Sequence, residues 1–265
     1  MKALLGDYPV TKHFKEKSSL EFADVKVPNT AFKRVVRDLE FDVAELAIMT
    51  FLLAKAHGKP YRLLPAVVTA RFQHPLLVSA KGLRPEQLEG KRVGQRSYSV
   101  TTAAWVRGIL ADDYGVNLDR VKWVTFEEPH VAEFRDPPTV ERAPAGKEMT
   151  AMLLSGELDA AIVGEIPKDE RLKPVIADPA AAAAAWKKKN RAIQINHMVT
   201  VKNTVDAATA KKIYEGLKQS REAAGNPEMN PFGMEENRRN LEVAIDCLYR
   251  QKMIPRRFAV EELFQ

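Results

Sequence analysis

The sequence has a single cysteine, Cys247, so no disulfide can form within its 265 residues. This cysteine stands in the apolar pattern LEVAIDCLYRQ, which predicts a buried thiol on a helix.

No apolar run approaches the ~20 residues that a membrane-spanning helix needs, and the start MKALLGDYPV lacks the hydrophobic stretch of a signal peptide. We therefore expect a soluble, cytoplasmic protein; a mature chain whose leader was trimmed is the alternative.

Several catalytic and ligand-binding motifs are also missing. The chain has no G-x-S-x-G, P-loop or G-x-G-x-x-G, which argues against a serine nucleophile and against nucleotide binding. The formal net charge is +6, but Lys and Arg are scattered except at 187–189, and no nucleic-acid motif accompanies them. A small anionic partner in a basic cleft fits this charge better than a nucleic acid, and no membrane partner is expected.

Strand-like and helix-like segments alternate along the chain. Strands are predicted at KALLG, LEFADVKVP, FDVAEL, YRLLPAVVT, KRVGQ, VKWVTF, LDAAIVGE and IQINHMVTVKN, and GDYP is interpreted as a turn. Helices are predicted in NTAFKRVVRDLE, VTTAAWVRGILADDYG, the alanine-rich DPAAAAAAWKKKN, and at about 205–224 and 233–252. The alternation favours parallel sheets covered by helices.

The grouping of these elements predicts two lobes. The first comprises residues 1–75 plus 200–265, and the second residues 80–192. The chain would then cross between lobes in strands near 74–80 and 194–202, which carry His74 and His197. We expect both histidines at the hinge, facing the cleft, because ligands of open α/β sheets bind outside the carboxyl ends of strands.

A series of segments carries a family resemblance over almost the whole chain. In order they are FDVAEL, RFQH, GLRPEQLEGKRVG, TAAWVRGILADDYGV, MLLSGELDAAI, NHMVTV and NPFGMEENRRNLEVAIDCLYRQKMIPRRFAVEELF. Together they resemble the 4,5-dihydroxyphthalate decarboxylase family. The chain differs from typical members in a compressed region around 125–150. Its loop QRSYSVT also differs, since the family more usually has a proline and an acidic residue before the tyrosine.

The resemblance implies both a fold and a reaction. The fold is the two-lobed α/β fold of type 2 periplasmic binding proteins: two mixed sheets flanked by helices, a central cleft and two crossover strands. The reaction is loss of one carboxylate from a hydroxylated aromatic dicarboxylate, with 4,5-dihydroxyphthalate giving protocatechuate (3,4-dihydroxybenzoate) and CO2 as the expected case. The alternative function is that of a non-enzymatic solute-binding protein for a small, aromatic carboxylate.

Proton transfer is the chemistry that such a decarboxylase has to supply. Histidine serves as acid or base near neutrality, so His74 and His197 are the catalytic candidates. The plainer interpretation of each is a hinge histidine that is hydrogen-bonded to the backbone.

Glu45 ends the strand FDVAE and is expected to orient a histidine or to accept a phenolic proton, with a buried structural carboxylate as the alternative. His57 is interpreted as the neighbour of a helix end and His13 as an exposed loop residue.

The loop QRSYS and the helix after it are the expected carboxylate-binding element. Free amides at the helix start and the hydroxyls of Ser97, Ser99 and Thr101 would hold an anion; plain N-capping is the alternative. Tyr98 and Tyr8 are expected to line the substrate ring by stacking or hydrogen bonding.

Arginine clamps are the other expected carboxylate ligands. Arg71, three residues before His74, is the first choice for a bidentate clamp. Arg96 is the alternative and Arg135 a weaker one, whereas Arg107 is predicted on the outer face of its helix. Glu165 ends a strand of the second lobe and is either a substrate contact or a solvated loop residue.

No organic cofactor is expected, because a phenol para to the departing carboxylate is its own electron reservoir. His74 and His197 with Glu45 would also pass as a partial metal site, so a divalent metal is the alternative, although no HxH or HExxH spacing occurs. The sequence leaves a homo-oligomer open.

Overall fold

The computed structural model describes all 265 residues, which form two compact units. Unit 1 comprises Met1–Arg71 and Ala192–Gln265, and unit 2 comprises Phe72–Arg191. The chain passes between them at 71–72 and 191–192, a few residues before the predicted crossings. The reason lies in β11 (Ile195–Lys202), which pairs along its length with strands of unit 1 and therefore belongs to that unit.

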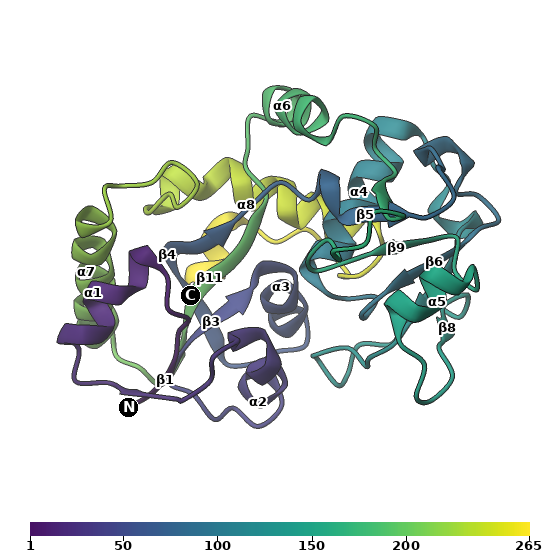
Figure 1. Ribbon diagram of the computed structural model, residues 1–265. Helices are drawn as coiled ribbons and strands as arrows, with labels where there is room; N and C mark the ends of the chain where they lie inside the picture. Colours follow the sequence, from purple (N-terminus) through teal and green to yellow (C-terminus); the bar gives the residue numbers. More distant parts are fainter. The chain divides into compact units, whose positions relative to one another are not determined.

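Unit 1 is built on a five-stranded sheet in the order β2-β1-β3-β11-β4 (Figure 1). Its strands are β1 (Lys2–Leu4), β2 (Glu21–Phe22), β3 (Val43–Ala47), β4 (Tyr61–Ala70) and β11. The first three are parallel, whereas β11 runs antiparallel to both β3 and β4. β3 is buried at every residue, as expected of a central strand covered on both faces.

Helices cover this sheet. They are α1 (Pro9–Lys17), α2 (Phe32–Val36), α3 (Ile48–Ala56), α7 (Ala207–Ala223) and α8 (Met234–Arg250), with 3-10 turns η1 (Pro28–Ala31) and η5 (Val260–Phe264). α1 and α7 pack side by side (Figure 1). Phe14 of α1 and Ile213 and Leu217 of α7 join one apolar cluster with Val199 and Val201 of β11. This packing fixes the position of the chain's first helix on the unit.

Unit 2 has a six-stranded sheet in the order β10-β5-β9-β6-β7-β8. Its elements are η2 (His74–Leu76), β5 (Leu77–Ser79), η3 (Pro85–Gln87), β6 (Arg92–Gln95), α4 (Thr101–Tyr114), η4 (Leu118–Arg120), β7 (Lys122–Thr125), β8 (Glu141–Arg142), α5 (Met149–Ser155), β9 (Ala160–Ile162), β10 (Lys173–Pro174) and α6 (Pro179–Asn190). Strands β9, β6, β7 and β8 are parallel, and β5 is antiparallel to β9 and β10. Both units therefore contain the mixed sheets that the family resemblance implied.

The first forty residues differ from the prediction. The sequence-based interpretation stopped at a turn in GDYP, whereas a nine-residue helix, α1, follows it. Pro9 is the first residue of that helix, where its fixed φ and missing N–H cost nothing. The strand predicted at LEFADVKVP contains only Glu21–Phe22, because pairing with β1 stops after the N–H of Ala23 donates to the carbonyl of Ala3.

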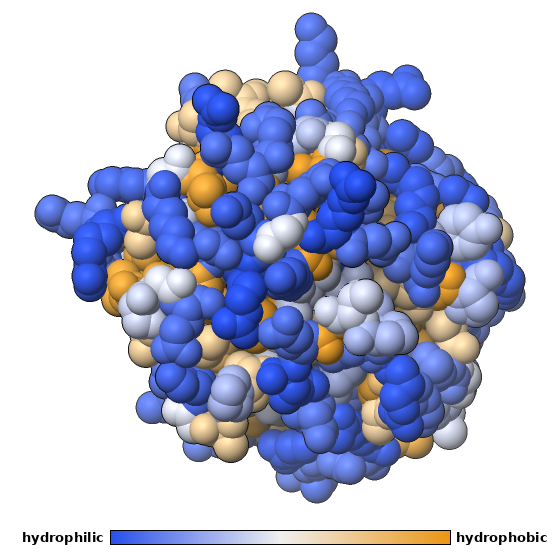
Figure 2. Space-filling model, turned by 90° about the vertical axis from the view of Figure 1, so that its right-hand side faces the viewer, coloured by the Kyte–Doolittle hydropathy of each residue, from blue (hydrophilic) through white to orange (hydrophobic).

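The surface is mostly polar. Figure 2 shows one face on which hydrophilic residues predominate and hydrophobic ones form small separate patches. Large apolar side chains are exposed only at Met1, Val27, Ile166 and Tyr249. Scattered residues of this kind need no partner to cover them. Each helix is too short or too polar to cross a bilayer.

Candidate functional site

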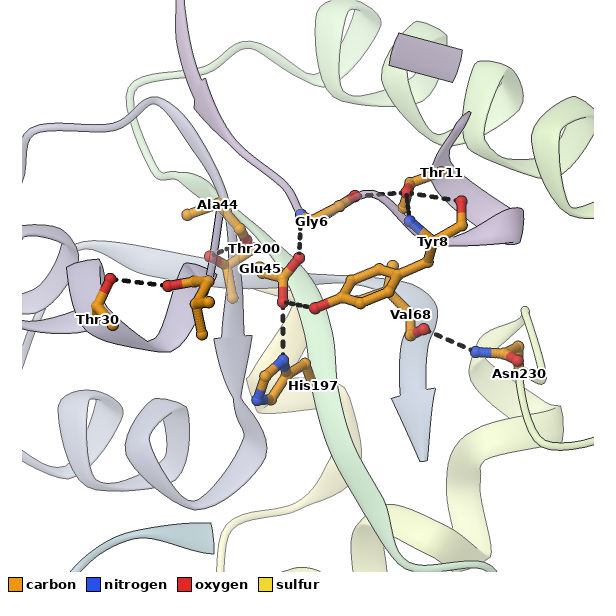
Figure 3. Close-up of polar contacts among 11 residues, drawn as sticks. Gly6, Tyr8, Thr11, Thr30, Ala44, Glu45, Val68, His197, Thr200 and Asn230 are labelled. Atoms are coloured by element: carbon orange, nitrogen blue, oxygen red, sulfur yellow. Dashed lines mark hydrogen bonds and ion pairs between the residues drawn. The ribbon is translucent and has the colours of Figure 1, made fainter. Parts of the chain in front are cut away.

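Three side chains of unit 1 meet around one buried carboxylate. Oε1 of Glu45 accepts hydrogen bonds from the hydroxyl of Tyr8 (2.8 Å) and from Nδ1 of His197 (2.7 Å). Oε2 accepts a third from the backbone N–H of Gly6 (2.6 Å). Figure 3 shows these contacts converging on Glu45 from three separate chain segments. We call Gly6, Tyr8, Glu45 and His197 the Glu45 cluster.

The sheet topology explains why these residues meet. β1 and β3 are parallel, with Leu4 opposite Ala44, so the chain just beyond β1 runs beside Glu45. β11 is antiparallel to β3 on its other side and brings His197 to the same edge. The Glu45 cluster thus lies just beyond the carboxyl end of β1 and two residues before that of β3, near the edge where open α/β sheets bind their ligands. Glu45 was predicted to end its strand, but it is the middle residue of β3, because pairing with β11 continues to Ala47.

A tight turn between β1 and α1 places Tyr8. A Cβ at Gly6 would lie 2.5 Å from the Tyr8 ring, so only glycine leaves room for this ring. The hydroxyl of Thr11 donates to the carbonyl of Gly6 (2.6 Å) and accepts from the N–H of Tyr8 (3.0 Å), which closes the turn. Gly6 and Thr11 were not identified from the sequence; a glycine at a strand end, three residues before the proline that starts a helix, was the available signal.

Burial sets the electrostatics of the Glu45 cluster. Glu45 is 0% exposed, and a buried carboxylate is tolerated only when donors pair with it. Burial, and then the adjacent Glu45 charge, raise the pKa of the Tyr8 phenol, so Tyr8 acts as a hydrogen-bond donor and not as an ionised group.

His197 has one engaged and one unengaged ring nitrogen. A carboxylate only accepts hydrogen bonds, so the contact with Glu45 fixes a proton on Nδ1. Nε2 points away from Glu45, and no contact to it is drawn among the unit 1 residues around it (Figure 3). The side chain is 17% exposed and packs edge-on against Phe32, with ring centroids 5.1 Å apart. Such an oriented imidazole can take up or release a proton at Nε2.

His74 lies in unit 2 and has a different environment. It is 1% exposed, and neither ring nitrogen has a hydrogen-bond partner. The rings of Phe72 and Trp186 lie 6.3 and 6.5 Å from it, and Trp186 contacts Trp105. Burial lowers the pKa of His74 to about 4, so the imidazole is neutral at pH 7.

The loop between β6 and α4 holds the predicted carboxylate-binding residues. Ser97 and Ser99 are buried, with their hydroxyl oxygens 3.5 Å apart, and Tyr98 and Thr101 are buried as well. The N-cap of α4 is Val100, and no side chain caps the helix start. The alternative of plain N-capping by a serine or threonine is therefore wrong.

Arg107 is a buried residue that the sequence analysis placed wrongly. It was predicted on the outer face of its helix, but it is 0% exposed. Its Nη1 donates to Oε1 of Gln95 (2.7 Å), and its guanidinium carbon lies 3.8 Å from the centroid of the Tyr98 ring. Helical spacing does not distinguish a buried arginine from a solvated one; the polar Gln95 at the end of buried β6 was the only available signal.

The other residues predicted to bind substrate are Arg71 in unit 1 and Arg96, Arg135 and Glu165 in unit 2. Arg71 is exposed at the end of β4, and Glu165 is an exposed loop residue after β9. Nη1 of Arg96 lies 4.0 Å from Oε2 of Glu127. Arg135 donates to the carbonyls of Ala132 and Phe134 in its own loop. Within unit 1, no arginine makes a hydrogen bond or ion pair with the Glu45 cluster.

The structure contains no group of three or more His, Cys, Asp or Glu side chains that could hold a metal ion. Glu45 and His197 are two such groups in contact, and their third partner, Tyr8, donates a hydrogen bond to the carboxylate. Glu45 and His197 thus form an oriented carboxylate–histidine pair.

Two named proteins are similar to the chain in sequence, and both are called 4,5-dihydroxyphthalate decarboxylase. No protein-family model matches the chain. A 4,5-dihydroxyphthalate decarboxylase of Pseudomonas putida is 30% identical over 175 residues, covering 60% of this chain and 68% of that protein. One of Comamonas testosteroni is 28% identical over 194 residues, covering 67% of this chain and 59% of that protein. The chain thus spans less than two thirds of the length of the second relative.

Solved structures share the fold. The alkanesulfonate-binding protein SsuA of Xanthomonas axonopodis pv. citri, bound to MOPS, has a TM-score of 0.56 at 12% identity, covering 98% of this chain and 96% of that one. The periplasmic aliphatic sulphonate-binding protein SsuA of Escherichia coli has a TM-score of 0.56 at 9% identity, covering 100% and 96%. At these identities the likeness concerns the fold alone, and it confirms the periplasmic-binding-protein fold predicted from the sequence.

Proposed function

The chain belongs to the 4,5-dihydroxyphthalate decarboxylase family, and on that premise we propose that it removes one carboxylate from a hydroxylated aromatic dicarboxylate. The expected reaction converts 4,5-dihydroxyphthalate to protocatechuate and CO2. One observation carries the proposal: a buried carboxylate, Glu45, orients the imidazole of His197 at 2.7 Å and leaves its Nε2 unengaged.

The substrate's own hydroxyl makes the chemistry possible. Direct loss of CO2 from an aryl carbon would leave an unstable carbanion in the ring plane. When the phenol para to the carboxylate loses its proton, its electron pair shifts into the ring and the carbon bearing the carboxylate takes up a proton. The C–C bond then breaks, CO2 leaves, and the bonding pair restores the aromatic phenolate, which is protonated again.

In this proposal the Glu45 cluster moves the proton. Nε2 of His197 accepts the phenolic proton, and the charge of Glu45 stabilises the imidazolium that forms. Tyr8 and the N–H of Gly6 hold the carboxylate in place, so Tyr8 acts as a positioning residue. Acid–base groups of this kind typically contribute ~10²–10⁴-fold to the rate.

His74 remains a proposed second proton-transfer residue. With a pKa of about 4, almost none of its imidazole is protonated and able to donate at pH 7, and the neutral form is a weak base. We therefore assign the main acid–base step to His197. Replacing His74 tests its part in the reaction, and a turnover close to wild type would remove it from the mechanism.

The loop after β6 is the proposed carboxylate-binding element of unit 2. Ser97, Ser99 and Thr101 provide buried hydroxyls at the uncapped start of a 14-residue helix, where amide donors and the helix dipole favour an anion. Arg71 and Arg96 are the proposed clamps for a second carboxylate, and Tyr98, Glu165 and Arg135 remain proposed contacts.

We further propose that the reaction needs no cofactor. Prolonged dialysis against a chelator should leave the rate of CO2 release unchanged. A loss of activity that a divalent ion restores would contradict this part of the proposal and leave the decarboxylase assignment standing.

The alternative is a solute-binding protein for a small aromatic carboxylate. The likeness to SsuA concerns a fold that serves binding proteins, and an anion-binding loop suits both functions. The two functions differ in one observable, which is whether the bound ligand loses CO2.

The decisive experiment offers the purified protein a panel of mono- and dihydroxylated phthalates. CO2 release and the aromatic product are measured for the wild type, His197→Gln, and the matched control His57→Gln, which replaces an exposed histidine at the end of α3. We expect turnover of a substrate with a para hydroxyl, a ~10²–10⁴-fold loss in His197→Gln, and an unchanged control. Saturable binding without product would favour the solute-binding function.

A further inference from the structure

A groove lies between α1 and α7 in unit 1, apart from the Glu45 cluster. Its volume is about 380 Å³, and the lining residues come from the second half of α1, the segment that follows it and one face of α7, together with Met1. No member of the Glu45 cluster contributes to it. Its volume falls within the range of small-molecule sites, roughly 300–1,000 Å³.

The floor of the groove is apolar. Phe14 of α1 and Ile213 of α7 are 7% and 5% exposed, and Leu20 is half-buried beside them. α7 comes this close because residue 216 is glycine: a Cβ there would lie 2.8 Å from the Phe14 ring. A floor of this kind favours the apolar part of a ligand over water.

The rim of the groove is positively charged. Lys17 and Lys212 line it and make no ion pair, whereas Lys15 on α1 pairs with Asp7 and Lys218 on α7 pairs with Glu215. His13 lines it as well, and no acidic side chain does. The ammonium groups of Lys17 and Lys212 are therefore not neutralised by an ion pair, and their positive charge at the edge of the apolar floor favours an anion.

The polar groups that bind phosphate best are missing here. No arginine lines the groove to provide a bidentate fork. The start of α7 beside it is already capped, because the carboxylate of Asp206 accepts from the N–H of Thr209 at 2.9 Å. The lining thus favours a carboxylate on an apolar body over a compact dianion.

We propose that this groove is a binding site for a small organic carboxylate with a compact apolar body. The body lies on Phe14, Leu20 and Ile213, and the carboxylate is held by Lys17 and Lys212. The proposal does not depend on the decarboxylase function.

The test uses the full-length protein and 4-phenylbutyrate as probe, with binding followed by calorimetry and by NMR shifts of unit 1. The double variant Lys17→Gln/Lys212→Gln removes both rim charges. Its matched control, Lys12→Gln/Lys211→Gln, removes two exposed lysines from the same helices that do not line the groove. Both double variants remove two positive charges. A difference in binding between them therefore reports the loss of contacts in the groove and not the change in net charge.

We expect one saturable site, about tenfold weaker binding in Lys17→Gln/Lys212→Gln, and unchanged binding in the control. The neutral analogue 4-phenylbutan-1-ol should bind about tenfold more weakly than the acid. Equal losses in both double variants, equal affinity for the alcohol, or displacement of the probe by inorganic phosphate at similar concentration would overturn the proposal. His197→Gln should bind the probe normally, and so a failure of the proposed enzymatic function stays distinguishable.

Discussion

Glu45 and His197 are diagonal neighbours across two antiparallel strands. In the register of β3 and β11, His197 lies opposite Ala47, and Val199 lies opposite Glu45. The two-residue offset keeps both side chains on one face of the sheet, and the small Ala47 leaves space for the imidazole to reach the carboxylate. Backbone hydrogen bonds of two central strands therefore fix this contact, which suits a site that must hold its geometry.

Replacing the negative charge of Glu45 with a neutral amide tests whether that charge contributes to the rate of CO2 release. In Glu45→Gln the side chain keeps its size, but an amide no longer stabilises an imidazolium at His197. We expect the rate of CO2 release to fall by ~10²–10⁴-fold while the circular-dichroism spectrum is retained. Glu40→Gln, which removes a partly exposed carboxylate paired with Arg34, is the control. Equal rates in the two variants would contradict the role of Glu45.

A methyl group at Gly6 should displace the Tyr8 ring. Because the added Cβ would lie 2.5 Å from that ring, we expect Gly6→Ala to lower the free energy of unfolding by about 1–3 kcal/mol. Urea unfolding measures the change. Gly164→Ala is the control, since nothing lies within 4 Å of its added Cβ. A variant as stable as the control would show that the turn accommodates a larger residue.

Removal of the buried guanidinium of Arg107 should lower the free energy of unfolding. Arg107→Met keeps the length of the side chain, but it leaves Oε1 of Gln95 without its donor and the Tyr98 ring without its cation. We expect a loss of about 3 kcal/mol in the free energy of unfolding. Arg120→Met, at an arginine whose side chain is 71% exposed, should cost little by comparison. Similar losses in both variants would argue against a structural role for Arg107.

His74 should make stability depend on pH. Its pKa of about 4 in the folded protein lies below the ordinary 6.5, so the unfolded chain binds its proton first as the pH falls. The folded state is therefore destabilised as the pH falls from about 6.5 to 4, by about 3 kcal/mol at most. In His74→Leu this part of the pH dependence should vanish, while His57→Gln retains it. Denaturant unfolding between pH 7 and 4 measures the difference, and equal slopes in both variants would refute the assignment.

The fold was largely predictable because apolar periodicity reports local structure. Central strands such as β3 and β11, and the long helices α4, α7 and α8, gave strong periodic patterns and were predicted near their actual positions. α1 was missed because its apolar residues are few, and its packing against α7 involves residues some two hundred positions away. Local patterns carry no information on such distant contacts.

The Glu45 cluster was predictable only in part. Glu45 was expected to orient a histidine, and the structure places it against His197. The contributions of Gly6 and Thr11 depend on the exact turn between β1 and α1, which residue types alone do not define. The burial of Arg107 depends likewise on which face of α4 packs on the sheet, and both faces of that helix contain apolar residues.

The place of β11 in its sheet has a consequence for synthesis of the chain. β3 and β4 are made early, but β11, which separates them, emerges only after all of unit 2. Unit 2 is one continuous segment that contains all six strands of its own sheet and can fold first. Until β11 arrives, β3 and β4 present open edges of the kind that aggregate. Completion of the unit 1 sheet therefore has to await β11, which is synthesised only after Arg191.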